Sequence, residues 1–154
     1  MILRRAVPDD AQAIAIVHRT AVRASLSFLP DLHTAEEDLT FFSERFLPAN
    51  DVWVADAEGQ VAGYIGFDDG WIHHLYLLPE FQGRGIGPQL LALALADGRR
   101  RRLWTFQRND RARRFYEARG FVLLELTDGS GNEEKTPDAL YEWRPDIQKT
   151  SRRL

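Results

Sequence analysis

Apolar positions in the first third of the chain repeat at helical spacing and predict two helices. The first is expected over about residues 9–29, where Pro30 ends it. Thr34 with Glu37 three residues later is a capping-box pattern, which predicts that a second helix begins there and runs to Pro48 and Asn50. The expected apolar faces consist of Ile14, Val17, Ala21 and Leu29 in the first helix and Leu39, Phe42 and Phe46 in the second.

The pattern then changes to β-rich runs separated by short polar turns. Glu58-Gly59 and Asp68-Asp69-Gly70 are turn sequences, and strands joined by such short turns form an antiparallel meander. A further short strand is expected before the first helix. The strands predicted up to this point lie at residues 2–7, 52–55, 61–67 and 71–77.

Helices and strands alternate through the rest of the chain. Gly120 is a helix stop, since glycine accepts the left-handed conformation there. The element order is β-α-α-β-β-β-α-β-α-β-β, which predicts an α/β (α+β) fold with a mixed sheet and helices on both faces. The length of 154 residues, without repeat or linker, predicts one domain over 1–154. The expected elements are helices at 88–96 and 110–119 and strands at 102–106, 121–126 and 139–143.

Composition narrows the class of protein. Apolar residues make up 44% and charged residues 28%, close to the averages of soluble globular proteins. Cysteine is absent, which excludes disulfides, thiolate metal ligands and a cysteine nucleophile. The net charge of −3 gives no basic field for nucleic acid, and no apolar run approaches the roughly 20 residues of a membrane helix. We therefore expect a soluble, cytoplasmic protein with no metal, nucleic-acid or membrane partner.

The loop after the predicted meander carries the strongest chemical signal. It reads Gln82-Gly-Arg-Gly85-Ile-Gly87 and places three glycines at alternate positions directly before a helix. Successive N–H groups of such a turn and the positive end of the helix suit a pyrophosphate. A tight strand-to-helix connection is the alternative explanation. The spacing is not G-x-G-x-x-G, and no Gly-Lys-Ser/Thr follows, so the two common nucleotide motifs do not fit.

The segment 82–87 matches the signature Q/R-x-x-G-x-G/A, and the chain resembles the GNAT superfamily of acyl-CoA-dependent N-acyltransferases. The resemblance implies a mostly antiparallel sheet of six to seven strands and acetyl-CoA as co-substrate. It extends upstream through Leu75-Tyr76-Leu77-Leu78-Pro79 and downstream through Asn109, Ala112, Phe115-Tyr116-Glu117 and Gly120-Phe121.

The resemblance also implies which residues bind the cofactor. The strand residues Leu75 to Leu77 would pair with the pantetheine arm, and the N–H near Leu75 would donate to the thioester oxygen. Asn109 would contact the same arm, although a helix N-cap explains this residue equally well. The cofactor-binding residues predicted in this way are Leu75, Tyr76, Leu77, Gln82, Gly83, Arg84, Gly85, Ile86, Gly87, Asn109 and Tyr116.

Two residues are the candidate catalytic groups. The resemblance implies that Tyr116 protonates the leaving thiolate, and a phenol with a pKa of about 10 is suited to this role at neutral pH. Its alternative role is packing beside Phe115. His74 is favoured over His73 as the base that deprotonates the amine, because it lies next to Leu75. A water chain is the alternative, and the other candidate bases are Asp31, His33, Glu37 and Glu133.

The resemblance places the acceptor pocket near residues 28–33 and 128–138. The second segment is acidic, through Glu133, Glu134 and Asp138, and would attract a cationic amine, or it is simply a solvated hairpin tip. The basic run 99–102 is interpreted as a solvated loop between a helix and a strand, with the CoA phosphate and nucleic acid as alternative partners.

These patterns predict an enzyme that moves an acetyl group from acetyl-CoA to a primary amine. Direct attack in a ternary complex is expected, because no cysteine is present to carry the acetyl group. The expected acceptor is a small molecule or a peptide N-terminus. The sequence leaves open whether two copies form a homodimer through the last strands. The alternatives are a non-catalytic acyl-CoA-binding module of the same fold and a protein that binds ATP or NAD through the glycine loop.

Overall fold

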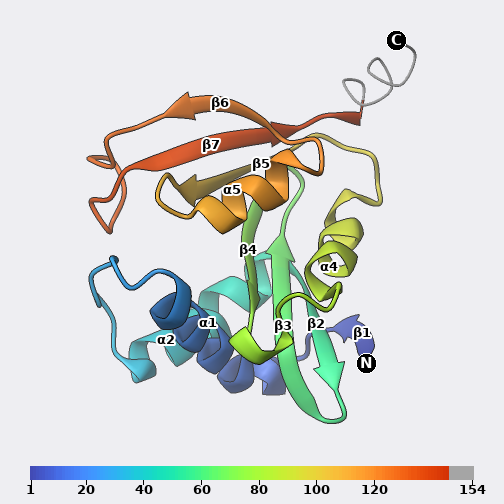
Figure 1. The fold of residues 1–154 in the computed structure, drawn as a ribbon. Helices are drawn as coiled ribbons and strands as arrows, with labels where there is room; N and C mark the ends of the chain where they lie inside the picture. Colours follow the sequence, from blue (N-terminus) through green and yellow to red (C-terminus); the bar gives the residue numbers. More distant parts are fainter. Residues whose placement is uncertain (146–154) are drawn as a thin grey trace. The chain divides into compact units, whose positions relative to one another are not determined.

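The computed structural model describes residues 1–145, and contacts within the chain divide it into two compact units. The first unit comprises Met1–Asp68 with Ile72–Ala94, and the second comprises 69–71 with the chain from Leu95 onward. Both units combine helices with antiparallel strands (Figure 1), so the predicted α/β class is confirmed. No helix in the described part of the chain is long and apolar enough to cross a bilayer.

The first unit is built on a four-stranded sheet in the order β1-β2-β3-β4. All neighbouring strands are antiparallel, which confirms the predicted meander. Glu58 (φ 52°) and Gly59 (φ 89°) both adopt the left-handed conformation that a two-residue hairpin turn requires. The strands are β1 (Ile2–Arg5), β2 (Asp51–Ala57), β3 (Gln60–Phe67) and β4 (Ile72–Leu77).

The helices of this unit differ from the predicted ones mainly at their ends. The first ends at Ser25 rather than near residue 29, because the Leu26 backbone leaves the helical region at φ −124° and ψ 48°. The second begins at the predicted capping box, in which Glu37 N donates to Thr34 Oγ1 at 3.1 Å. The helices are η1 (Pro8–Asp10), α1 (Ala11–Ser25), α2 (Ala35–Phe41), the π-turn η2 (Phe42–Phe46), α3 (Leu47–Ala49), η3 (Pro79–Phe81) and α4 (Ile86–Leu95).

The core of the first unit lies between the sheet and the helices α1 and η2. Tyr64 on β3 is fully buried, and every residue of β3 after Gln60 is buried, so both faces of this strand are covered. A side chain at Gly66 would overlap the ring of Phe46, which explains why glycine occupies this strand position. The core side chains include Ile14, Val17, Phe42, Phe46, Val52, Val54 and Tyr64.

The second unit contains a three-stranded antiparallel sheet in the order β5-β7-β6 and one helix. The expected single mixed sheet is therefore found as two antiparallel sheets. A lone parallel bridge joins Trp71 to Arg102 at the start of the second one. The elements are β5 (Arg101–Phe106), α5 (Asp110–Glu117), β6 (Val122–Leu126) and β7 (Asp138–Trp143).

The interpretation of the basic run 99–102 as a solvated loop is confirmed for the exposed Arg99 and Arg100 but is wrong for Arg101 and Arg102. Strand β5 begins within it, and Arg101 is only 2% exposed, with its guanidinium 2.9 Å from Asp97. Arg102 pairs with the buried Glu142 at 3.1 Å. Strand β5 thus places Arg101 and Arg102 where they form ion pairs with Asp97 and Glu142.

Candidate functional site

The glycine loop presents its backbone to solvent at two of its three glycines. Gly83 (φ 77°) and Gly85 (φ 82°) lie in the left-handed region and are exposed. A Cβ atom would meet nothing within 4 Å at Gly83, and only the Gln89 side chain, at 3.9 Å, at Gly85. Glycine is therefore required here by the backbone conformation and not by crowding inside the protein.

Gly87 differs from the other two glycines. It lies in the first turn of α4, is buried, and does not adopt a positive φ. The prediction that the helix begins at Pro88 is wrong, because α4 starts at Ile86, whose side chain is 3% exposed in the core. Ile86 and Gly87 thus contribute to packing and to the N–H groups of the first helical turn.

The start of α4 has the properties of an anion site. The first N–H groups of a helix have no partner within it, and the helix dipole adds partial positive charge there. The first turn of α4 contains no acidic residue. Arg84 is exposed, with its guanidinium 5.3 Å from the centre of the Phe81 ring. Gln82 joins the loop to the end of β4 through Leu77 O at 3.5 Å.

Strand β4 is the last strand of its sheet and pairs with β3 alone within that sheet. Leu75 lies opposite Ile65, and Leu77 lies opposite Gly63. The side chains of Leu75, Tyr76 and Leu77 are half-buried. A strand with one unpaired side in its sheet matches the expected pairing with an extended amide-containing chain.

His74 lies among aromatic rings on the inner face of this sheet. Its ring stacks on that of His18 from α1, with centroids 5.1 Å apart and an interplanar angle of 12°. The Phe46 ring is 4.5 Å away, and Tyr64 Oη lies 2.9 Å from His74 Nδ1. His73 points elsewhere and pairs with Asp68 at 2.8 Å, so neighbouring strand residues point to opposite faces, as expected.

Burial determines the protonation of this cluster. It lowers the pKa of His74 well below 6.5 and raises the pKa of Tyr64 well above 10. The Tyr64 hydroxyl and His74 Nδ1 share a hydrogen bond, and its direction follows the tautomer of the ring. His74 is a neutral ring at pH 7, and one of its two nitrogens is engaged by Tyr64. This geometry does not favour His74 as the base, and that assignment stays a prediction.

His18 was not among the predicted site residues. Burial also lowers its pKa, and its Nδ1 is buried with no hydrogen-bond partner in the described part of the chain. The sequence does hold a signal for it, since residue 18 falls between Ile14 and Ala21 on the apolar face of the first helix. A polar ring on an otherwise apolar face marks a packed or functional residue.

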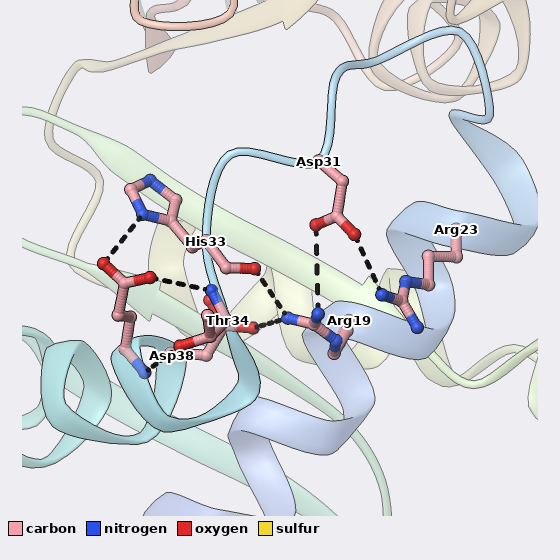
Figure 2. Close-up of polar contacts among 7 residues, drawn as sticks. Arg19, Arg23, Asp31, His33, Thr34 and Asp38 are labelled. Atoms are coloured by element: carbon pink, nitrogen blue, oxygen red, sulfur yellow. Dashed lines mark hydrogen bonds and ion pairs between the residues drawn. The ribbon is translucent and has the colours of Figure 1, made fainter.

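The loop between α1 and α2 contains two of the other candidate bases, and it is held by arginines from α1 (Figure 2). Arg19 donates to Asp38 at 2.8 Å and to the backbone oxygen of His33 at 3.1 Å. Arg23 donates to Asp31 at 3.0 Å. These contacts give Asp31 and the backbone at His33 a structural role in fixing the loop.

In the second unit, α5 presents the other two predicted site residues. Asn109 Oδ1 accepts from Ala112 N at 3.2 Å and so caps the helix, which confirms the structural explanation for this residue. Tyr116 is 8% exposed and packs edge-on against Phe115 and Phe121, with centroids 5.1 and 5.2 Å away. No group of three or more histidine or acidic side chains suited to a metal ion occurs within residues 1–145.

An α/β fold with an exposed glycine loop between a strand and a helix defines the class of protein, and comparison with known proteins defines the family. The model of the acetyltransferase (GNAT) family matches residues 19–121. An uncharacterized N-acetyltransferase of Archaeoglobus fulgidus is 32% identical over 151 residues, covering 86% of this chain and 100% of that protein. The chain belongs to the GNAT family of N-acetyltransferases.

Two further similarities agree with this. The peptidyl-lysine N-acetyltransferase YjaB of Salmonella typhimurium is 29% identical over 125 residues, covering 79% of this chain and 83% of that one. The crystal structure of the PaiA N-acetyltransferase of Thermoplasma acidophilum in complex with coenzyme A has a TM-score of 0.74 at 22% identity. The match covers 93% of this chain and 98% of the PaiA chain, and it supports the assignment of the fold.

Proposed function

We propose that the protein transfers an acetyl group from acetyl-CoA to a primary amine. The observation that carries this proposal is the exposed, positive-φ backbone at Gly83 and Gly85 before the N-terminus of α4, in a chain of the GNAT family. PaiA is described in complex with coenzyme A, and YjaB is named for an amine acceptor, the lysine side chain of a peptide. Both descriptions support the same chemistry here.

The residues of the glycine loop fit the phosphates of the cofactor. The open space beside Gly83 and Gly85 leaves the backbone accessible to a phosphate, and Arg84 adds positive charge. Leu75, Tyr76 and Leu77 supply strand backbone for the amides of the pantetheine arm, and the N–H near Leu75 donates to the thioester oxygen. Asn109 keeps its role as the cap of α5 and adds a contact to the same arm.

The transfer is a direct attack in a ternary complex. The amine nitrogen bonds to the acetyl carbon, the C–S bond breaks, and Tyr116 gives its phenolic proton to the departing thiolate. Solvent then returns a proton to Tyr116. The proton lost by the amine passes to water, because the His74 ring lies within an aromatic cluster and is hydrogen-bonded to Tyr64. Holding amine and thioester together supplies much of the acceleration.

The test is acetyl-CoA-dependent release of thiol over a panel of amines, followed by the mass of the product. Turnover with an added mass of one acetyl group supports the proposal. Binding of CoA without turnover of any amine would instead support a non-catalytic acyl-CoA-binding module. Stronger thermal stabilisation by ATP or NAD than by CoA would contradict both.

A further inference from the structure

His18 on α1 lies in the aromatic cluster beside β4, and the mechanism described above gives it no role. Its ring stacks on His74 with centroids 5.1 Å apart, and it meets Tyr76 edge-on at 4.9 Å and Phe42 at 5.5 Å. The residue as a whole is half-buried, but its Nδ1 is buried and has no hydrogen-bond partner within residues 1–145. Buried polar atoms in proteins are nearly always paired, so this exception requires an explanation.

A comparison with the other three histidines of the chain sets His18 apart. Each of them has a polar partner, and the pairs are His33 with Glu37 at 4.0 Å, His73 with Asp68 at 2.8 Å and His74 with Tyr64 at 2.9 Å. An apolar ring or a leucine would pack at position 18 without the cost of an unpaired polar atom. Packing alone therefore does not account for a histidine at this position.

The strand beside His18 is the one whose backbone the proposed function assigns to the cofactor. Leu78 N donates to a backbone oxygen of β3 at 2.9 Å, and the backbone groups of an antiparallel strand alternate in direction. The N–H and C=O groups of residues 74 and 76 therefore point to β3, and those of Leu75 point away from it. The ring of His18 thus contacts His74 and Tyr76, the two neighbours of the residue that would hold the thioester oxygen.

The charges around His18 leave it neutral but able to take up a proton. Burial lowers its pKa, Asp38 on α2 raises it, and Arg19 on α1 lowers it. Arg19 and Asp38 form an ion pair at 2.8 Å (Figure 2), so their effects on the ring oppose each other. The other titratable groups of the cluster are uncharged at pH 7, namely His74, Tyr64 and Tyr76. His18 is therefore a neutral base at pH 7, and Asp38 stabilises the imidazolium that forms on protonation.

We propose that His18 receives the proton that the acceptor amine must lose before it attacks the thioester, with one water molecule between the amine and the ring. The inference rests on the proposed function, which delivers this proton to water, and it adds the side chain that takes the proton from there. Nε2 is the accepting nitrogen, because Nδ1 is closed to solvent.

The proton transfers balance over one turnover. The ammonium gives one proton to water, which passes one of its own to His18, so a neutral amine and an imidazolium result. The amine nitrogen then bonds to the acetyl carbon, the C–S bond breaks, and Tyr116 protonates the thiolate. The nitrogen loses its second proton to solvent as the amide forms. Solvent restores the proton of Tyr116, and the imidazolium releases its proton to solvent.

The test is the pH dependence of kcat between pH 7 and 9, with saturating acetyl-CoA and the amine of the panel that is acetylated fastest. The wild-type kcat is expected to change little, because His18 is already neutral in this range. The kcat of His18→Gln is expected to be roughly 10²-fold lower at pH 7, within the usual contribution of a general base. It should then rise about tenfold per pH unit, because a growing fraction of the bound amine is already neutral. Near wild-type kcat at pH 7, or a loss by the same factor at every pH, would overturn the proposal.

Phe42→Leu is the matched control for packing. It disturbs the cluster at a buried ring that meets His18 edge-on and leaves the histidines in place. The variant is expected to unfold at a lower temperature and to keep the shape of the wild-type pH profile. A profile that rises with pH in Phe42→Leu as it does in His18→Gln would trace the effect to packing and contradict the role of His18.

A histidine NMR titration of the wild-type protein with CoA bound tests the same proposal without any variant. The ring signals of His18 are expected to show a neutral ring at pH 7, with a pKa below the ordinary 6.5 because of burial. A His18 ring that is charged at pH 7 would overturn the proposal, since it could not take up a further proton.

These measurements separate the inference from the proposed function. Acetylation of amines with a wild-type pH profile in His18→Gln retains the enzyme and rejects the role of His18. Absence of acetylation of every amine by the wild-type protein rejects the enzyme, and the role of His18 fails with it, even where the titration finds a neutral ring.

Discussion

The chemical role open to His74 depends on the residues that surround its ring. The alternation of side chains along a strand is sufficient to separate His73 from His74, and the structure confirms that they point to opposite faces. The sequence does not reveal that Tyr64 lies opposite Tyr76 in the sheet, where its hydroxyl reaches His74. Register across strands sets this contact, and register is not readable from one strand.

Tyr116→Phe is expected to lower kcat by roughly 10²–10⁴-fold, the usual cost of losing a general acid. The change removes one oxygen and keeps the ring, so the edge-on contacts with Phe115 and Phe121 remain. Affinity for acetyl-CoA is expected to change little. Steady-state turnover with saturating acceptor and CoA binding should be measured on one preparation, under conditions in which chemistry limits the rate.

Tyr141→Phe is the matched control, since it removes a buried hydroxyl from the same unit. Tyr141 donates to Glu117 at 2.5 Å and accepts from Arg113 at 2.9 Å, so its loss costs about 1–3 kcal/mol of folding stability and leaves kcat unchanged. Near wild-type turnover by the Tyr116→Phe variant would contradict the assignment of Tyr116 as the general acid. A parallel fall in turnover and cofactor affinity would make Tyr116 a binding residue only.

At the scale of elements, the order of helices and strands was predictable, while several ends were not. The capping box at Thr34 and Glu37 begins a helix as predicted, because two side-chain bonds satisfy its free N–H groups locally. The end of α1 at Ser25 and the start of α4 at Ile86 carry no such local signal. The π-turn of η2 places Phe42 and Phe46 in the core, so packing determines it.

Gly83→Ala is expected to weaken acetyl-CoA binding by at least about tenfold while the protein stays folded. A Cβ atom at this position meets no protein atom within 4 Å, so it intrudes only on the space beside the exposed backbone. The left-handed φ of 77° adds a strain of order 1 kcal/mol. Calorimetry of acetyl-CoA binding and thermal unfolding would measure the two effects.

Gly59→Ala provides the comparison, because Gly59 has a similar φ of 89° and also meets nothing within 4 Å, but lies in the β2–β3 turn. Gly59→Ala should lower the free energy of unfolding by the same amount as Gly83→Ala and leave the affinity for acetyl-CoA unchanged. Equal affinities in the two variants would show that the loop is not the phosphate site. Gly87 is unsuited to this test, since it is buried in α4 and its substitution would disturb packing.

At the scale of the whole molecule, seven strands were predictable and their partition between two sheets was not. Hydrophobic and turn patterns locate the strands and turns. They do not reveal which strands pair with each other in one sheet. The same limit applies to Arg102, whose ion pair with Glu142 depends on the pairing of β5 with β7, whereas Arg101 pairs with the nearby Asp97. The family signature was readable because two of its glycines, Gly83 and Gly85, are required by local backbone conformation.

The stability of the first unit is expected to fall as the pH decreases from 6.5 to 5. Burial lowers the pKa of both His18 and His74, so the folded chain holds them neutral while the unfolded chain binds protons near pH 6.5. The unfolded state then binds more protons, and stability rises with pH through this window. The slope is up to about 1.4 kcal/mol per pH unit for each histidine.

Urea unfolding at fixed ionic strength between pH 5 and 7.5 would measure this slope, and His74→Gln should make it shallower. The window lies above the range in which carboxylates such as Asp10 and Asp56, whose pKa values are lowered by Arg4 and by backbone N–H groups, begin to contribute. His73→Gln is the comparison on the same strand, because His73 is exposed and paired with Asp68 rather than packed in the aromatic cluster. A slope in His74→Gln equal to that of the wild type would mean that the buried His74 ring is not what links folding to pH.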